Sequence, residues 1–107
     1  MSDHIQVITT IDREEAAAEI ARLLVEKRLA ACVQVVGPIT STYRWKGRIE
    51  TTREWQCVAK TRRELYPRVE EAIRQAHPYE EPEILAVSMA AASRTYLAWL
   101  DEQVASE

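Results

Sequence analysis

The seven residues from His77 to Glu83, HPYEEPE, gather many of the groups in this chain that could do chemistry. They place one imidazole, one phenol and three carboxylates around two prolines. An imidazole is a ligand for copper and zinc, and carboxylates bind hard divalent cations together with water. The same residues suit a turn between a helix and a strand, because a proline disfavours a helical residue before it. The segment is therefore either a cation site or only a structural corner.

Two residues of this segment are candidate metal ligands, His77 and Glu83. His77 is expected on the solvent side of a helix end, where a structural role beside the helix dipole is the alternative. Glu83 is expected to begin a strand, whereas Glu80 and Glu81 fit a solvated loop. A single carboxylate binds calcium or magnesium weakly. Copper or another divalent cation, weakly held, is the cofactor that these residues suggest.

A second set of candidates, for a ligand cleft or a contact between subunits, comprises Tyr43, Trp45, Glu50, Lys60 and Tyr79. Aromatic rings with a few convergent polar groups are typical of a ligand pocket. The alternative is packing between subunits for the aromatic rings, which is favoured for Trp45. For Lys60 the alternative is an ion pair with Glu50 or Glu54 on a facing strand.

The candidate metal ligands and the candidate cleft residues must both be positioned by strands and helices. Residues 5–11, IQVITTI, predict a buried strand, and Asp12 with Glu15 has the form of a capping box that begins an amphipathic helix. A second strand, AACVQVVGPIT, is bent at Gly37 and Pro38 and resumes as STYRW. Lys46 and Gly47 predict a tight turn into a third strand.

The third strand is expected over residues 48–60, with the register near Arg53 left open. Strict alternation would put two sets on opposite faces, namely Ile49, Trp55, Cys57 and Ala59 on one and Glu50, Thr52, Glu54 and Gln56 on the other. A second helix is expected between Thr61 and Ala76, with Pro67 in or near its first turn. Residues 83–92 predict the fourth strand, and Ser93 caps a short last helix.

This order predicts an α+β ferredoxin-like βαββαβ sandwich with a long hairpin of the second and third strands and a short C-terminal helix, as a single domain over residues 1–107. The hairpin exceeds what one helix layer can cover, and it carries Tyr43, Trp45, Ile49 and Trp55. Exposed aromatic rings on a bare hairpin favour aggregation. We therefore expect another copy of the chain to bury it.

Composition excludes several classes of protein. The net charge of −3 gives no basic footprint for nucleic acid, and no apolar run approaches eighteen residues, so neither nucleic acid nor membrane is an expected partner. Two glycines are too few for a P-loop or a dinucleotide-binding loop. Cys32 and Cys57 lie in apolar stretches without CxxC spacing and are expected to be buried, reduced thiols. The beginning of the chain lacks the features of a signal peptide, so a cytoplasmic location is expected.

Five blocks, EKRLAACVQV, TSTYRWKGRIE, AKT, HPYEEPEILAV and YLAWL, resemble in order and spacing the CutA divalent-cation tolerance proteins. The resemblance implies a tight homotrimer, no enzyme chemistry, and tolerance to divalent cations, chiefly copper. In the copper-binding members it implies a first-strand cysteine and two adjacent histidines; here Thr9 and Ala76 occupy two of those positions, and only His77 remains. The alternative is a regulatory trimer similar to PII proteins, with a small ligand between subunits. A hydrolase or an RNA-binding module has little support.

Overall fold

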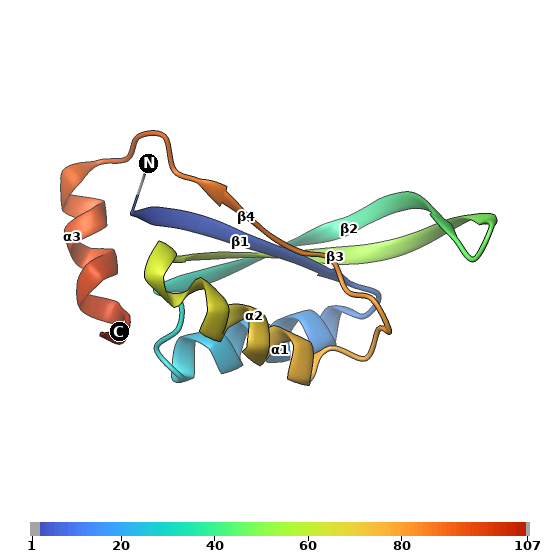
Figure 1. Cartoon of the computed structure of the whole chain (residues 1–107), viewed down its shortest axis with the longest axis horizontal. Coiled ribbons are helices and arrows are strands. Elements are labelled where there is room, and N and C mark those ends of the chain that lie inside the picture. Colours follow the sequence, from blue (N-terminus) through green and yellow to red (C-terminus); the bar gives the residue numbers. More distant parts are fainter. Residues whose placement is uncertain (1–2, 107) are drawn as a thin grey trace.

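The central strand of the sheet shows why one face of the fold is buried. The computed structural model describes residues 3–106, and in it β1 (His4–Ile11) buries Ile5 and Val7 on the face that the helices cover. Two helices lie side by side on that face, α1 (Glu14–Glu26) and α2 (Tyr66–Ala76) (Figure 1). No helix within residues 3–106 is long and apolar enough to cross a membrane.

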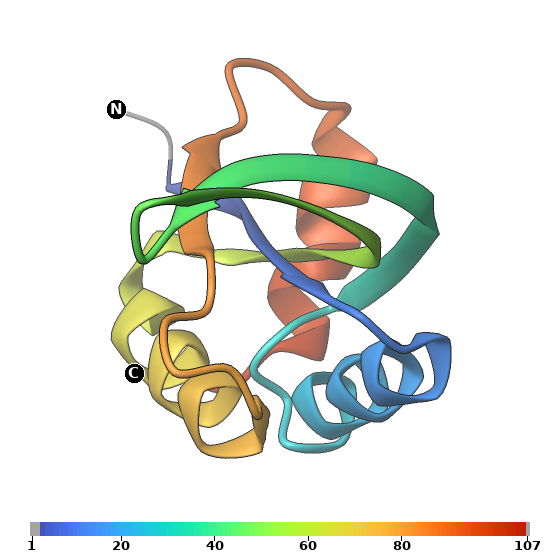
Figure 2. The same ribbon diagram turned by 90° about the vertical axis from the view of Figure 1, so that its right-hand side faces the viewer.

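The sheet has the strand order β2-β3-β1-β4, and all neighbouring strands are antiparallel. Its other strands are β2 (Cys32–Trp45), β3 (Arg48–Arg62) and β4 (Ile84–Ser88). The last helix, α3 (Arg94–Gln103), lies apart from α1 and α2 at one end of the molecule (Figures 1 and 2). This arrangement confirms the predicted ferredoxin-like fold.

The hairpin of β2 and β3 extends well beyond the helices (Figure 1). Its turn is at Lys46 and Gly47, which both have positive φ, of 50° and 80°. A turn with two such residues matches the right-handed twist of the strands, as predicted for this pair. The β2 register shifts between Val36 and Ile39, which confirms the irregularity predicted at Gly37 and Pro38.

The core consists of the buried residues of β1, α1, the loop after α1, β3, the turn before α2 and α2 itself, together with two residues from the C-terminal segment. Those two are Leu100, which is fully buried, and Val104. Ser93 caps α3 by accepting a hydrogen bond from the backbone N–H of Tyr96, as predicted. The exposed side of α3 is held by Asp101, whose carboxylate lies 2.8 Å from His4 Nε2 and 2.7 Å from Arg62.

Two predicted boundaries differ from the structure, and the predicted place of Pro67 in the first turn of the second helix is confirmed. Asp12 is not a cap, because Arg13 precedes α1 and makes no capping hydrogen bond through its side chain. A short 3-10 turn, Arg63–Leu65, comes before α2, so Pro67 falls in the first turn of that helix, where a missing N–H does no harm. The strand expected over 83–92 ends at Ser88, where pairing with β1 stops.

The predicted alternation along β3 is wrong as a single pattern. Odd positions from Cys57 to Thr61 are buried under the helices, whereas in the arm the less exposed positions are even ones, ending at the buried Glu54. The set of buried positions changes along β3 because the helices cover only its second half and end where the arm begins. Trp55, expected on the exposed arm, is instead partly buried against the core.

Candidate functional site

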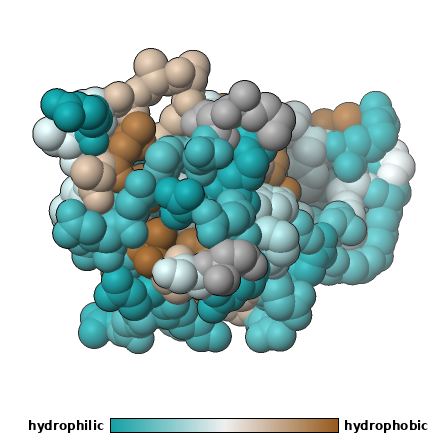
Figure 3. All heavy atoms as spheres, turned by 60° about the vertical axis from the view of Figure 1, so that its left-hand side comes forward, coloured by the Kyte–Doolittle hydropathy of each residue, from teal (hydrophilic) through white to brown (hydrophobic). Residues whose placement is uncertain are grey.

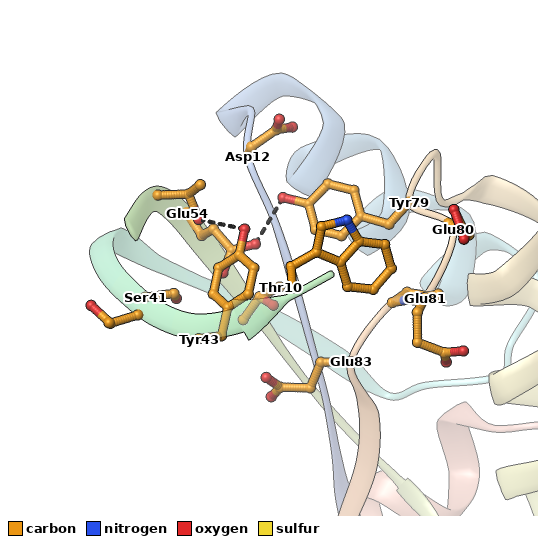
Figure 4. Close-up of a pocket in the computed structure, with 13 residues that line it drawn as sticks. Thr10, Asp12, Ser41, Tyr43, Glu54, Tyr79, Glu80, Glu81 and Glu83 are labelled. Atoms are coloured by element: carbon orange, nitrogen blue, oxygen red, sulfur yellow. Dashed lines mark hydrogen bonds between the residues drawn. The ribbon is translucent and has the colours of Figure 1, made fainter. Parts of the chain in front are cut away.

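The hairpin arm and the loop after α2 border a partly open cavity of about 810 Å³ (Figure 4). The end of β1, both strands of the arm and the HPYEEPE segment all contribute to it. Its lining residues are Thr10, Asp12, Ser41, Thr42, Tyr43, Trp45, Thr52, Glu54, Tyr79, Glu80, Glu81, Pro82 and Glu83. We call this cavity the cleft.

Acidic and aromatic side chains dominate the cleft. Five of its lining residues carry a carboxylate, three carry an aromatic ring, and none is a lysine or an arginine. Side-chain hydroxyls supply most of the remaining polar groups. Such a surface attracts cations, because several like charges lie together on walls of low dielectric constant.

The innermost carboxylate belongs to Glu54, which is only 4% exposed. Its Oε2 accepts a hydrogen bond of 2.7 Å from the hydroxyl of Tyr79 (Figure 4). Burial, and then this hydrogen bond to Glu54, raise the pKa of Tyr79 well above the usual value of a phenol. Tyr79 therefore remains a protonated donor at any physiological pH.

His77 ends α2 and is 8% exposed, so its expected position on the solvent side is wrong. Its Nε2 lies 2.7 Å from the carbonyl oxygen of Thr10, and its Nδ1 accepts a hydrogen bond of 3.2 Å from the backbone N–H of Tyr79. Because the carbonyl can only accept, Nε2 is the nitrogen that donates in this arrangement, and Nδ1 is the one that accepts. Both nitrogens are thus occupied, and a metal at either would displace a hydrogen bond.

The rings of His77 and Tyr79 also meet edge to face, with centroids 4.5 Å apart. His77 therefore ties the loop to the end of β1 and holds Tyr79 toward Glu54. In this chain the imidazole acts as the structural support of the cleft wall.

The structure brings together only part of the predicted site. Tyr43, Trp45, Tyr79 and Glu83 line the cleft, whereas the other predicted site residues, Glu50, Lys60 and His77, do not.

Lys60 lies on a different part of the sheet, where its ammonium group donates a hydrogen bond of 2.6 Å to Gln34 Oε1. The alternative ion pair of Lys60 with Glu50 or Glu54 is also absent from the described part of the chain.

Two residues of the cleft were missed in the sequence. Asp12 was expected to cap α1, but its side chain faces the cleft from the end of β1 (Figure 4). The sequence places Glu54 with the polar even-numbered residues of β3 and does not predict its burial. The interruption of the alternation at Arg53 was the only signal that the neighbouring Glu54 occupies an unusual environment.

The donor set for copper is incomplete. Thr9 is buried beneath the helices opposite Cys57, and its hydroxyl has no hydrogen-bond partner in the described structure. Within residues 3–106 no three side chains of His, Cys, Asp or Glu are grouped so that they could hold a metal ion. Copper prefers imidazole and thiolate ligands. The residues at the positions that the resemblance implies for copper therefore do not fit this ion well.

The two cysteines differ in their environments. Cys57 is buried, and burial raises the pKa of its thiol to about 11. Cys32, also expected to be buried, is half-exposed at the start of β2, and its Sγ lies 3.6 Å from the hydroxyl of Tyr96. An edge strand leaves its first residue uncovered, which explains the difference.

Comparison with known proteins links the chain to one family. The family model described as "CutA1 divalent ion tolerance protein" matches residues 5–103. The "Divalent-cation tolerance protein CutA" of Thermus thermophilus is 44% identical over 96 residues, which cover 90% of this chain and 93% of that protein. "Protein CutA" of Homo sapiens is 44% identical over 91 residues, or 85% of this chain, but this chain spans only 51% of the human protein.

Solved structures agree with these relatives. The structure of the divalent cation tolerance protein Cut A1 from Thermus thermophilus superposes with a TM-score of 0.92 at 41% identity, and the match covers 95% of this chain and 99% of that one. The long arm and the strand order are therefore those of a known group of proteins.

Proposed function

This chain belongs to the family of CutA1 divalent ion tolerance proteins, and from this premise we propose that it contributes to tolerance of divalent cations by binding a cation in the cleft. The role is one of binding and not of catalysis. The observation that carries the proposal is the lining of the cleft, with five carboxylates and no lysine or arginine.

Oxygen ligands favour a hard cation. A divalent ion with several waters would be held by one carboxylate of the cleft, such as Glu83 or Asp12. Binding would be weak, because one chain offers no closed set of ligands. His77 would support the loop and would not ligate the ion, since both of its nitrogens are engaged. Copper, the ion that the family resemblance suggests, would bind less well here than in members with a thiol and two imidazoles.

Calorimetric titration of the purified protein with Mn²⁺ and with Cu²⁺ tests this assignment. We expect Mn²⁺ binding that weakens in Glu83→Gln and is unchanged in Glu19→Gln, an exposed carboxylate on α1 outside the cleft. Unchanged Mn²⁺ binding in a double Asp12→Asn, Glu83→Gln variant would contradict the proposal. Loss of Cu²⁺ binding in His77→Gln, with the fold retained, would instead restore His77 as a ligand.

The second part of the proposal is a homotrimer. The open face of the sheet carries Leu85 and Val87, which are 41% and 45% exposed, and the arm carries Ile49, which is 61% exposed. The surface around α3 is by contrast mainly hydrophilic, with small hydrophobic patches (Figure 3). Both outer strands, β2 and β4, also keep a free edge, and such apolar strands are stabilised when another copy covers them.

Light scattering after size exclusion, at low micromolar concentration, measures the assembly directly. We expect the mass of three chains, and dissociation that coincides with unfolding. A stable, folded monomer would contradict the homotrimer and leave the cation site to be judged by the titrations alone.

A second candidate function is the binding of a small organic ligand, as in a regulatory trimer. The observation that favours it is the size of the cleft, because about 810 Å³ is in the range of pockets for small molecules and far exceeds the needs of a bare ion. Native mass spectrometry of the protein as purified would show a co-purified small molecule as a defined added mass.

A cytoplasmic location is part of the proposal as well. Both cysteines are free thiols, which suits a reducing compartment. Fractionation of cells that produce the tagged protein would test it, and recovery with an oxidising compartment would contradict it.

A further inference from the structure

Glu54 is a buried carboxylate that no cationic side chain of the described residues pairs with. It is 4% exposed, and within residues 3–106 its carboxylate accepts one hydrogen bond, from the neutral phenol of Tyr79, and forms no ion pair. A charge withdrawn from water is destabilising unless an opposite charge compensates it. Because Glu54 lines the cleft, a cation that enters the cleft would supply that compensation.

The walls beside Glu54 are aromatic. In the single chain Tyr43 and Trp45 are 40% and 37% exposed, and Tyr79 is half-buried next to them. A hydrated metal ion gains little from such surface. An organic cation gains both apolar contact and the attraction between a positive charge and the face of an aromatic ring.

The carboxylates of the cleft are spread along it. Asp12 and Glu83 lie on opposite sides of the rings of Tyr43 and Tyr79 (Figure 4). Acidic groups at two ends with apolar rings between them match a ligand that carries positive groups at both ends of an alkyl chain. A compact ion with one charge could satisfy only one end.

The rim of the cleft already holds one ammonium group, that of Lys46 in the hairpin turn. Its Nζ lies 5.5 Å from the centroid of the Trp45 ring and 3.7 Å from Glu80 Oε1. Lys46 and Glu80 are about 70% exposed, so this contact is weak and easily displaced. The chain's own lysine thus shows which chemical group these walls accept.

We propose that the cleft binds an alkyl polyamine, a linear molecule with two or more ammonium groups. The inference rests on the proposed role of the cleft as a cation site, and it adds the class of ligand. One ammonium group would lie against Glu54 and Asp12, the alkyl chain would lie against the aromatic rings, and a second ammonium group would reach Glu83. The ligand would displace Lys46 from the rim.

The experiment is calorimetric titration of the assembled protein in 0.15 M salt, roughly the ionic strength at which surface attraction is strongly screened. Three probes are used: spermidine, n-butylamine with a single ammonium group, and Mn²⁺ alone. We expect saturable binding of spermidine and much weaker binding of n-butylamine. Glu54→Gln should weaken spermidine binding about tenfold or more, and the matched control Glu19→Gln should leave it unchanged.

Two further variants separate the aromatic contact from charge. Trp45→Leu, at an exposed position, should weaken spermidine binding severalfold and leave Mn²⁺ binding unchanged. Lys46→Asn should tighten spermidine binding about two- to fivefold by removing the competing ammonium group, with Lys27→Gln as the control of equal charge change. Asn suits the positive φ of 50° at this position, so the turn is retained.

Each outcome decides between the two proposals. Mn²⁺ binding without spermidine binding overturns the polyamine inference and leaves the proposed function intact. Spermidine binding without Mn²⁺ binding supports the inference and removes the metal site. Equal loss in Glu54→Gln and Glu19→Gln would mean attraction by net charge alone and would also overturn the inference. If Glu54→Gln does not assemble, the exposed Glu83→Gln provides the same test from the other end of the cleft.

Discussion

The hydroxyl of Tyr79 donates a hydrogen bond of 2.7 Å to Glu54, and this contact joins the loop after α2 to the base of the hairpin arm. The two residues lie 25 positions apart in the sequence, and both line the cleft. The contact fixes the inner wall of the cleft, because Tyr79 is in turn held by His77. The stability of the fold and the shape of the site therefore depend on the same few groups.

Replacement of Tyr79 by Phe should be more destabilising than loss of an ordinary surface hydroxyl. It leaves the buried carboxylate of Glu54 without its hydrogen bond, which costs about 1–3 kcal/mol. The free energy of unfolding in urea, at one fixed protein concentration, measures the effect. Tyr43→Phe is the control, because that hydroxyl only accepts a hydrogen bond of 3.3 Å from Thr52 on the exposed arm, and it should change stability by less than about 0.5 kcal/mol. Equal effects of the two variants would contradict the view that the buried Glu54 depends on its hydrogen bond from Tyr79.

His77→Ala should destabilise the protein by roughly 2–4 kcal/mol. It removes two hydrogen bonds and leaves the carbonyl of Thr10 and the N–H of Tyr79 without their buried partner. His77→Gln should recover part of this loss by offering a donor and an acceptor. Thermal unfolding of both variants provides the comparison. An alanine variant as stable as the wild type would show that His77 is free, and so available for a metal.

Gly37→Ala should be strongly destabilising for a steric reason. A Cβ atom at this position would lie 2.5 Å from Cδ1 of Trp55, which is packed against the core. Overpacking of this kind costs about 1–3 kcal/mol. Gly47→Ala meets open space but has φ of +80°, so it should cost only about 1 kcal/mol. If Trp55→Leu does not relieve the Gly37→Ala defect in a double-mutant cycle, the ring is not the cause.

Cys57 should make the protein less stable at alkaline pH. Burial raises the pKa of its thiol from 9.0 to about 11, so the unfolded chain ionises first. The stabilisation is complete below pH 9 and is lost as the pH rises to about 11. The pKa difference corresponds to roughly 2–3 kcal/mol. Unfolding free energies between pH 8 and 11 should fall less steeply in Cys57→Ala than in the wild type. Cys32→Ala, at a half-exposed position, should follow the wild type, and an identical slope in all three proteins would contradict a buried Cys57 thiol.

The sequence by itself determined the fold and the place of the hairpin. Alternating β-branched residues, an apolar stripe of helical spacing, Gly47 in the turn and Ser93 as a cap are local signals, and local signals survive without tertiary context. They also indicated that the HPYEEPE segment follows a helix and contains candidate ligand residues. The five blocks of sequence that resemble the CutA proteins then indicated the family.

Only the tertiary structure decided which residues share the cleft. Glu54 and Asp12 are buried or aimed inward because β1, β3 and the loop after α2 converge there, and no pattern within one strand contains that convergence. Likewise, only the packed structure shows that both nitrogens of His77 are engaged, which gives it a structural role in this chain. The physical reason is that burial and hydrogen-bond partners are set by contacts distant in sequence, whereas periodicity reports only which face of an element is apolar.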